Sequence, residues 1–282
     1  MFKRAVYTSI LFILYIAWRR LRIIKIFNRK CILITGGAGE LGIKLLELFL
    51  KNKEVTIIIV DIDQNKLNTL ADTYKGNIIT YCCDITDKPA VHAMIKSLQK
   101  KFTIDTLINN AGVVSKKELS QLRDEDIDKT FKVNVIAPII LTREILPQMI
   151  KNGAGHIVNI SSVAGLVGAP KLTDYCASKF ALVGFHAALQ KELEVYPNIY
   201  SSCICPYFFR SELFNSSKGY PWPLNYFIRI YTSREIAAKI YNDIDSLVDM
   251  SIHPPLFKYL LRIRFMFPKY IQDKFINLGS RI

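Results

Sequence analysis

Short apolar segments alternate with amphipathic ones along the central part of the chain. The apolar segments are about the length of buried strands and cover residues 30–35, 55–61, 78–86, 106–112 and 155–162. Segments with helical periodicity separate them, including residues 43–50, residues 88–100 and a helix that holds residues 131–135. Strands that alternate with helices predict a parallel sheet with helices on both faces. We therefore expect an α/β fold with a single Rossmann-type, doubly wound sheet over residues 30–252.

A glycine-rich turn follows the first predicted strand. Thr35 is followed by Gly36, Gly37, Ala38, Gly39, Glu40, Leu41 and Gly42, and a helical segment comes next. Strand, glycine turn and helix in this order are typical of dinucleotide-binding folds, because glycines let backbone amides approach a pyrophosphate at the helix N-terminus.

The second predicted strand ends in a carboxylate. Asp61 lies nineteen residues after Gly42, where a carboxylate accepts the hydroxyls of an adenosine ribose and repels a 2′-phosphate. Asp63 follows it in place of an arginine. The pattern favours NAD over NADP, with an ordinary turn residue as the alternative interpretation of Asp61.

Tyr175 and Lys179 are spaced for one face of a helix that begins near Asp174. A phenol titrates near ~10, so lowering its pKa by ~3 units requires about 4 kcal/mol. A unit charge at ~4 Å in an effective dielectric of ~20 supplies about that much. Ser162 precedes Tyr175 by thirteen residues and ends the fifth predicted strand. The pair alone also fits a solvated helix face, so the rest of the chain decides its meaning.

The formal net charge of +14 on its own suggests a nucleic-acid-binding protein. Residues 1–30 contain eight Lys or Arg and no acid, and residues 253–282 contain six Lys or Arg and one Asp. The ends therefore carry +8 and +5, which leaves +1 for the residues between them. A nucleic-acid groove needs its charge on the folded domain, so we expect no nucleic-acid partner.

The N-terminal residues 1–29 are apolar and basic. Residues 5–18 form an apolar run of fourteen between two pairs of basic residues. As a helix this run reaches ~21 Å, less than a hydrocarbon core of ~30 Å. Because both flanks are positive, we interpret the segment as an uncleaved anchor in the cytosolic leaflet. A single-pass span and a signal peptide are the alternatives, and the latter lacks a small-x-small cleavage site.

The C-terminal residues 253–282 begin with His253-Pro254-Pro255 and then interleave apolar and basic side chains. This pattern suits an amphipathic helix at a membrane surface, and a helix that packs on the domain is the alternative. The six cysteines have no metal-ligand spacing and lie mostly in apolar segments. We therefore expect reduced core thiols and no metal site. They are Cys31, Cys82, Cys83, Cys176, Cys203 and Cys205.

Taken in order, these features resemble the short-chain dehydrogenase/reductase family over roughly residues 30–215. The shared motifs are Thr35-Gly36 with Gly42, Asp84, Asn109-Asn110-Ala111-Gly112, Asn134, Ser162, Tyr175-x-x-x-Lys179, and Pro206 with Ser211. Residues 110–115, 174–180 and 183–186 resemble its membrane-bound branch, which holds epidermal retinol dehydrogenase and 17β-hydroxysteroid dehydrogenases of types 11 and 13.

The resemblance implies a catalytic role for four residues. Tyr175 would exchange a proton with the substrate oxygen, and Lys179 would lower its pKa and hold the nicotinamide ribose. Ser162, rather than Ser161, would hydrogen-bond the substrate oxygen, and Asn134 would hold a water that links Lys179 to solvent.

The resemblance also implies a set of cofactor-binding residues, in which Asp84 contacts the adenine, Asn109 lies at the strand end and Ser211 contacts the nicotinamide carboxamide. The set is Thr35, Gly36, Gly37, Gly39, Glu40, Leu41, Gly42, Asp61, Asp84, Ile85, Asn109, Ala111, Gly112, Tyr175, Lys179, Pro206 and Ser211.

Two residues depart from the family pattern. Glu40 replaces a glycine of the turn, and either crowds the pyrophosphate or stays in solvent if the turn follows the pattern Gly37-x-Gly39-x-x-Gly42. Tyr207 replaces the glycine after Pro206, as an aromatic does in related membrane-bound members. The aromatic segment at about 207–232 is expected to cover the substrate and suits a lipid alcohol.

We therefore expect an NAD-dependent dehydrogenase of a retinoid or steroid hydroxyl, on the cytosolic face of the endoplasmic reticulum or of lipid droplets. The resemblance implies a homodimer. One alternative is an NADPH-dependent reductase of a retinal or keto-lipid. Another is a membrane or lipid-droplet protein that keeps the fold without the chemistry, with Glu40 as the damage.

Overall fold

The computed structural model describes residues 29–76, 78–207, 209, 230–255, 257 and 259. Within these residues one sheet has the strand order β3-β2-β1-β4-β5-β6-β7, and all neighbouring strands are parallel. The strands are β1 (Cys31–Thr35), β2 (Thr56–Asp61), β3 (Ile78–Cys82), β4 (Thr106–Asn109), β5 (Gly155–Ile160), β6 (Ile199–Pro206) and β7 (Met250–His253). The order reverses between β1 and β4, which opens a crevice at the carboxyl ends of these strands.

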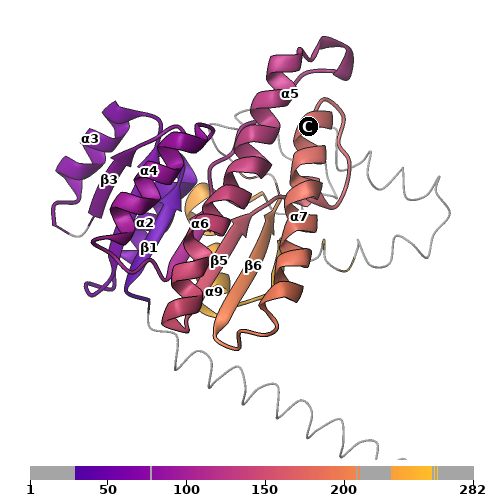
Figure 1. Ribbon diagram of the computed structural model, residues 1–282. Helices are drawn as coiled ribbons and strands as arrows, with labels where there is room; N and C mark the ends of the chain where they lie inside the picture. The colour runs from indigo at the N-terminus through magenta and orange to yellow at the C-terminus, as the bar shows by residue number, and fades with distance from the viewer. Residues whose placement is uncertain are drawn as a thin grey trace, which may run out of the picture.

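Helices cover both faces of the sheet (Figure 1), and the predicted doubly wound α/β fold is confirmed. One face carries α4 (Lys88–Gln99), α6 (Ala137–Asn152) and α7 (Thr173–Leu193), and the other carries α2 (Glu40–Phe49), α3 (Gln64–Thr73) and α9 (Ser233–Asp245). The other helices of the described residues are α5 (Asp124–Phe131), the π-helix η2 (Lys132–Ile136), and the short 3₁₀ turns η1 (Leu119–Gln121) and η3 (Val163–Gly165).

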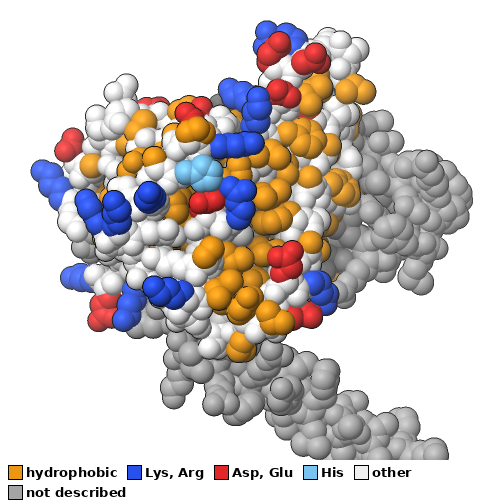
Figure 2. Space-filling model, in the orientation of Figure 1, with side chains coloured by type: hydrophobic (Ala, Val, Ile, Leu, Met, Phe, Trp, Pro, Cys, Tyr) orange, Lys and Arg blue, Asp and Glu red, His pale blue; other side chains and the backbone are white. Residues whose placement is uncertain are grey.

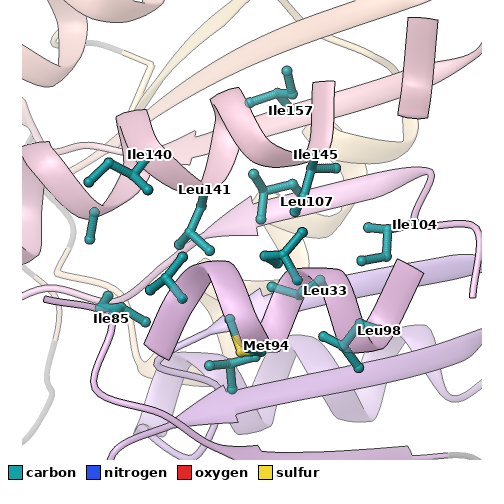
Figure 3. Close-up of a cluster of buried hydrophobic side chains, with 14 of the residues drawn as sticks. Leu33, Ile85, Met94, Leu98, Ile104, Leu107, Ile140, Leu141, Ile145 and Ile157 are labelled. Carbon is teal, nitrogen blue, oxygen red and sulfur yellow. The ribbon is translucent and has the colours of Figure 1, made fainter. Parts of the chain in front are cut away.

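The strands are apolar on both faces because both faces are covered. Successive strand residues point to opposite sides, so Leu33 and Ile58 pack towards α4 and α6, whereas Ile32 and Ile57 pack towards α2 and α9. Figure 3 shows part of the hydrophobic cluster between the sheet and its first face, where α4 and α6 lie against the strands. The sheet is thereby fixed from both sides, and the carboxyl ends of its strands form a rigid edge.

Some predicted boundaries differ from the observed ones because side chains bind the backbone. β3 ends at Cys82 and not at residue 86, since the Asp84 carboxylate accepts hydrogen bonds from the backbone and hydroxyl of Thr86 (both 2.8 Å) and forms a turn. The helix predicted to start at residue 43 starts at Glu40, directly after Gly39.

The helix predicted around residues 131–135 is the π-helical part of one continuous helix, Asp124–Asn152. Within the described part of the chain, this helix is long and apolar enough to cross a membrane, but half of its apolar window is buried inside the domain.

Five of the six cysteines are buried, Cys82 is exposed, and all six thiols are free. The face that carries α4, α6 and α7 shows hydrophobic side chains gathered over α6 and towards α7, with Lys and Arg side chains on the α4 side (Figure 2). Ile136 and Phe180 are among its exposed apolar residues. Most of the predicted lid, most of the C-terminal segment and all of the predicted N-terminal anchor except Arg29 lie outside the described residues.

Candidate active site

A cavity of about 900 Å³ runs along the carboxyl ends of the central strands. It is lined by most of the predicted site residues, namely Gly36, Gly39, Glu40, Leu41, Gly42, Asp61, Asp84, Ile85, Ala111, Gly112, Ser162, Tyr175, Lys179 and Pro206. Thr35, Gly37, Asn109 and Asn134 lie behind this wall, and Ser211 lies outside the described residues. A cavity of this size is in the range that holds a large cofactor or drug-sized ligand.

The glycine turn is packed backbone against backbone. Gly36 has a φ of +59°, and a Cβ there would lie 2.7 Å from the Cα of Ala111. A Cβ on Gly42 would lie 2.6 Å from the carbonyl oxygen of Gly36. The N-cap of α2 is Gly39, which has no side chain to accept hydrogen bonds from the first-turn amides. The turn therefore fits a pyrophosphate at the N-terminus of α2.

Asn110 ties the glycine turn to the end of β4. Its side-chain amide donates to the carbonyl oxygens of Thr35 and Gly36 (both 3.0 Å), and its backbone N–H donates to the Thr35 hydroxyl (3.1 Å). It also lines the cavity. Asn110 was not among the predicted site residues, although its place directly after a strand was a usable signal.

Asn109 lies inside the sheet instead of at the cavity wall. Its side-chain amide donates to Asn159 of β5 (2.9 Å), and the residue is 2% exposed. Adjacent residues at a strand end point to opposite sides, so the cavity side falls to Asn110. The Asn109 side chain therefore supports the strand pair β4–β5, and its predicted place beside the cofactor stays a prediction.

Asp61 both stabilises the glycine turn and faces the cavity. One carboxylate oxygen accepts from the backbone N–H of Ala38 (3.0 Å), and the other accepts from those of Ile62 (2.8 Å) and Asp63 (3.2 Å). Asp61 is therefore a turn residue that also presents its carboxylate to the cavity, and its role in cofactor choice stays a prediction.

Glu40 is half-buried in the first turn of α2, where it lines the cavity. Its carboxylate accepts a hydrogen bond from the hydroxyl of Ser233, the first residue of α9, which is 193 positions away in the sequence. The turn does not release Glu40 into solvent. A carboxylate at this place adds negative charge beside the expected pyrophosphate, and the Ser233 hydroxyl binds one of its two oxygens.

Tyr175 and Lys179 lie on the first two turns of α7, as predicted, and are 5% and 3% exposed. The Lys179 ammonium lies 5.6 Å from the centre of the Tyr175 ring and donates to the carbonyl oxygen of Ile160 (2.9 Å), the last residue of β5. The Ser162 hydroxyl accepts from the backbone N–H of Ala164 (3.1 Å) and forms a hydrogen bond with Tyr175. The three residues whose spacing was noted in the sequence, Ser162, Tyr175 and Lys179, therefore place a hydroxyl, a phenol and an ammonium at one corner of the cavity.

Burial governs the acidity of this pair. It raises the pKa of Tyr175 above its ordinary value, against the smaller lowering effect of the Ser162 hydrogen bond. Burial also lowers the pKa of Lys179 to about 8. The role of Lys179 in lowering the Tyr175 pKa stays a prediction, because, among the protein's own groups, burial and the Ser162 hydrogen bond are the main influences on that pKa.

Asn134 lies in the π-helix η2, behind Gly112. Its carbonyl oxygen accepts from the backbone N–H of Val113 (2.9 Å), and its amide donates to the Val113 carbonyl and to the Ser178 hydroxyl (both 3.0 Å). A Cβ on Gly112 would lie 3.5 Å from this side chain and 3.7 Å from the Lys179 nitrogen. Asn134 is therefore next to the catalytic corner and joins the loop after β4 to α7.

One group of lining residues was not predicted. It lies on α5 and η2 and consists of Glu125, Asp128, Lys129, Lys132 and Val133, and α5 carries no spacing that predicts a cavity.

Two residues of the predicted aromatic segment line the cavity. They are Tyr207 and Phe209, and the Tyr207 ring stacks on Phe257 with centroids 4.5 Å apart.

Comparison with known proteins gives one consistent result. A family model described as short chain dehydrogenase matches residues 30–219. The chain is 32% identical over 222 residues to short-chain dehydrogenase/reductase family 16C member 6 of Bos taurus, an alignment that covers 76% of this chain and 70% of the relative. It is 29% identical over 246 residues to 17-beta-hydroxysteroid dehydrogenase 13 of Homo sapiens, with 85% and 80% covered.

The alignment with estradiol 17-beta-dehydrogenase 11 of Homo sapiens, 36% identical over 185 residues, covers 64% of this chain and 61% of the relative. Among solved structures, 4-hydroxyisoleucine dehydrogenase complexed with NADH has a TM-score of 0.70 at 28% identity and covers 80% of this chain and 96% of its own. A short-chain dehydrogenase from Streptomyces avermitilis has a TM-score of 0.72 at 22% identity, covers 88% of this chain and 98% of its own, and shows likeness of fold.

Proposed function

This chain belongs to the short-chain dehydrogenase/reductase family and is an oxidoreductase acting on CH–OH groups, and we propose that it oxidises a hydroxyl of a retinoid or a steroid with NAD. The observation that carries the proposal is the corner formed by Ser162, Tyr175 and Lys179 in the wall of a cavity of about 900 Å³ that the glycine turn also lines. The names of the hydroxysteroid dehydrogenase relatives support the lipophilic substrate class.

Tyr175 takes the proton of the substrate hydroxyl in this proposal, and Ser162 hydrogen-bonds the same oxygen. Lys179 keeps its positive charge up to about its pKa of 8 and stabilises the phenolate that forms beside it. Lys179 and the glycine turn would hold a nicotinamide cofactor, which would supply the hydride acceptor and further positive charge at this corner. Because burial raises the pKa of Tyr175, we expect oxidation to speed up with rising pH until Lys179 loses its charge near pH 8.

Asp61 supports NAD over NADP. Its carboxylate faces the cavity at the end of β2, where a 2′-phosphate would meet like charge. The cationic residues among the described lining residues are Lys129, Lys132 and Lys179, and they lie on α5, η2 and α7, away from β2. A reductase of a retinal or keto-lipid would prefer NADPH. Among the described lining residues no cation lies at the end of β2 to bind the 2′-phosphate of that cofactor.

The apolar part of the cavity lining supports a lipophilic ligand. Tyr207, Phe209, Val113 and Val133 contribute aromatic and aliphatic surface, and removing apolar groups from water there gains free energy. Location on the cytosolic face of the endoplasmic reticulum or of lipid droplets, and a homodimer, stay predictions that rest on the basic apolar termini and on the family.

The first experiment measures NADH formation by the membrane fraction with all-trans-retinol and a panel of steroid alcohols, for the wild type and for Tyr175→Phe. We expect turnover that the substitution abolishes while NADH binding stays within about twofold. Tyr196→Phe is the matched control, because it removes a phenol hydroxyl just beyond the other end of α7. A Tyr175→Phe protein as active as this control would overturn the assignment, and a wild type that binds neither NAD nor NADP would favour a fold retained without chemistry.

A further inference from the structure

Two buried hydrogen bonds join the α5–η2 helix to α7. The Thr130 hydroxyl donates to the Asp174 carboxylate (2.8 Å), and the Asn134 amide donates to the Ser178 hydroxyl (3.0 Å). The two contacts are four residues apart on each helix, so they lie one above the other along the helix contact. All four side chains are at most 5% exposed, so water does not compete with either hydrogen bond.

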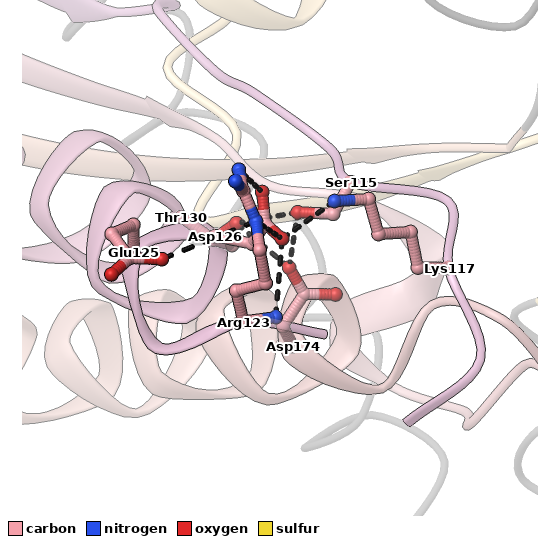
Figure 4. A network of polar contacts seen from close by, with 7 residues as sticks. All are labelled: Ser115, Lys117, Arg123, Glu125, Asp126, Thr130 and Asp174. Carbon is pink, nitrogen blue, oxygen red and sulfur yellow. Dashed lines mark hydrogen bonds and ion pairs between the residues drawn. The ribbon is translucent and has the colours of Figure 1, made fainter. Parts of the chain in front are cut away.

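The loop after β4 is bound to both contacts. The Ser115 hydroxyl donates to the same Asp174 oxygen that Thr130 binds (2.9 Å), and the backbone N–H of Val113 donates to Asn134 (2.9 Å). Figure 4 shows Ser115 and Thr130 converging on Asp174, with Lys117 bound to Asp126 farther along the loop. Loop, α5–η2 and α7 are therefore held together at two levels.

Each of these contacts lies one residue before a predicted catalytic residue of α7. Asp174 precedes Tyr175, and Ser178 precedes Lys179. Neighbouring residues of an α-helix point about 100° apart, so fixing Asp174 and Ser178 towards α5–η2 fixes the direction in which Tyr175 and Lys179 point. Ser178 also donates to the Tyr175 carbonyl oxygen (2.7 Å), which connects the two levels.

Burying the Asp174 carboxylate costs more free energy than a purely structural contact between two helices requires. Its second carboxylate oxygen is buried and has no hydrogen-bond partner among the described residues, although burial of a charged group costs free energy unless its bonds are satisfied. Its position in the first turn of α7 offsets part of that cost through the helix dipole.

We propose that Asp174, with Thr130 and Ser115, is a positioning group that sets the rotation of α7 and so aims Tyr175 at the substrate oxygen. The proposal rests on the function proposed above for Tyr175. Asn134 and Ser178 form a second level of contacts between the same helices, and we call the two levels together the brace. The hydroxyl groups of Ser115 and Thr130 touch neither substrate nor cofactor in this assignment, and act through Asp174.

The first test compares steady-state kinetics of the full-length protein with Thr130→Val, Ser115→Ala and Asp174→Asn. We expect Thr130→Val to lower kcat about tenfold while the KM of the alcohol and the Kd of NADH stay within about twofold, because small misplacement of a reacting group acts on the chemical step. Asp174→Asn keeps an oxygen that accepts both hydroxyls, so it should retain at least about half of kcat.

Ser202→Ala is the matched control. Ser202 lies on β6 and does not line the cavity, and the substitution removes a buried hydroxyl that forms a hydrogen bond with His156 of β5 (2.8 Å). We expect it to lower the melting temperature as Thr130→Val does, with kcat unchanged. Equal loss of kcat in both variants would reduce Thr130 to a structural role and overturn the proposal.

The second test needs no turnover. In protein labelled with 3-fluorotyrosine, the ¹⁹F resonance of Tyr175 is assigned by its loss in Tyr175→Phe. We expect Thr130→Val and Ser115→Ala to shift or broaden that resonance and Ser202→Ala to leave it in place. A wild type without activity on any alcohol would reject the proposed function, while an unmoved Tyr175 resonance in folded Ser115→Ala and Thr130→Val would reject the positioning role.

Discussion

The two ends of the sheet both bury ionisable groups, yet only one of them adjoins the described cavity. At the amino end the Arg29 guanidinium binds Asp245 (3.0 Å) and approaches His156 (3.4 Å), and His156 binds Ser202 (2.8 Å). At the carboxyl end Lys179 is just as buried, but it lies beside about 900 Å³ of open space. A buried charge is therefore a structural element at one end and part of a candidate active site at the other.

The physical cause of the shifted acidity is the same at both ends. Burial lowers the pKa of His156 well below its ordinary value, with a further contribution from the charge of Arg29, and burial lowers the pKa of Lys179 to about 8. Perturbed acidity alone therefore does not identify a site. What distinguishes Lys179 is a cavity in which its charge can act on a ligand.

The largest expected effect separates the two buried cations. Lys179→Met should lower kcat/KM of alcohol oxidation by about 100-fold or more, and should not destabilise the fold strongly, since it removes a buried charge. Arg29→Met should keep kcat and lower the free energy of unfolding by about 1–2 kcal/mol, because it removes the donor that binds the Ile244 carbonyl and approaches His156. Steady-state kinetics and urea unfolding measure both. Loss of kcat in Arg29→Met would break the comparison.

The second prediction concerns stability at acid pH. Burial lowers the pKa of His186 to about 4, so the unfolded chain binds a proton there between about pH 6.5 and 4 that the folded chain does not. Stability is fully present above about pH 6.5 and falls by about 3 kcal/mol as the pH drops through this window. His186→Gln should flatten the slope in urea unfolding, and an unchanged slope would contradict the assignment. The same sign holds for Lys179 between about pH 8 and 10.5.

The third prediction tests cofactor choice at the carboxyl end. Asp61→Asn keeps an oxygen for the Ala38 N–H and removes the charge, so kcat/KM with NADP should rise about tenfold relative to NAD. Asp63→Asn is the control, because Asp63 caps α3 and does not line the cavity. A ratio that moves equally in both variants would mean that Asp61 acts only in the turn.

The smallest expected effect is at Glu40. Glu40→Gly should tighten NADH binding by about threefold to fivefold, because it removes a negative charge from the first turn of α2 near the pyrophosphate. Ser233→Ala should weaken binding slightly, since it releases the carboxylate from α9. Fluorescence titration with NADH measures both changes, and weaker binding in Glu40→Gly would show that the carboxylate supports the turn.

The sequence predicted features that depend on local order. Strands, the glycine turn and the shared face of Tyr175 and Lys179 follow from periodicity within one element, and the strand ends meet because the sheet is parallel. The Glu40–Ser233 and Thr130–Asp174 contacts join distant segments and have no local signature. Whether Asn109 or Asn110 faces the cavity depends on the residue at which β4 ends, and a sequence pattern does not locate a strand end to within one residue. The acidity of Tyr175 depended on burial, which a spacing pattern does not contain.

The one-residue offset between the brace and the catalytic pair on α7 limits how the chain can change length over evolution. Insertions in residues 166–172 lie before α7 and leave the offset of Asp174 to Tyr175 intact. One residue inserted between Asp174 and Lys179 would rotate everything after it by about 100° and send Lys179 away from the cavity. Length variation is therefore expected to accumulate before Thr173, while the first two turns of α7 keep their length even where their residues change.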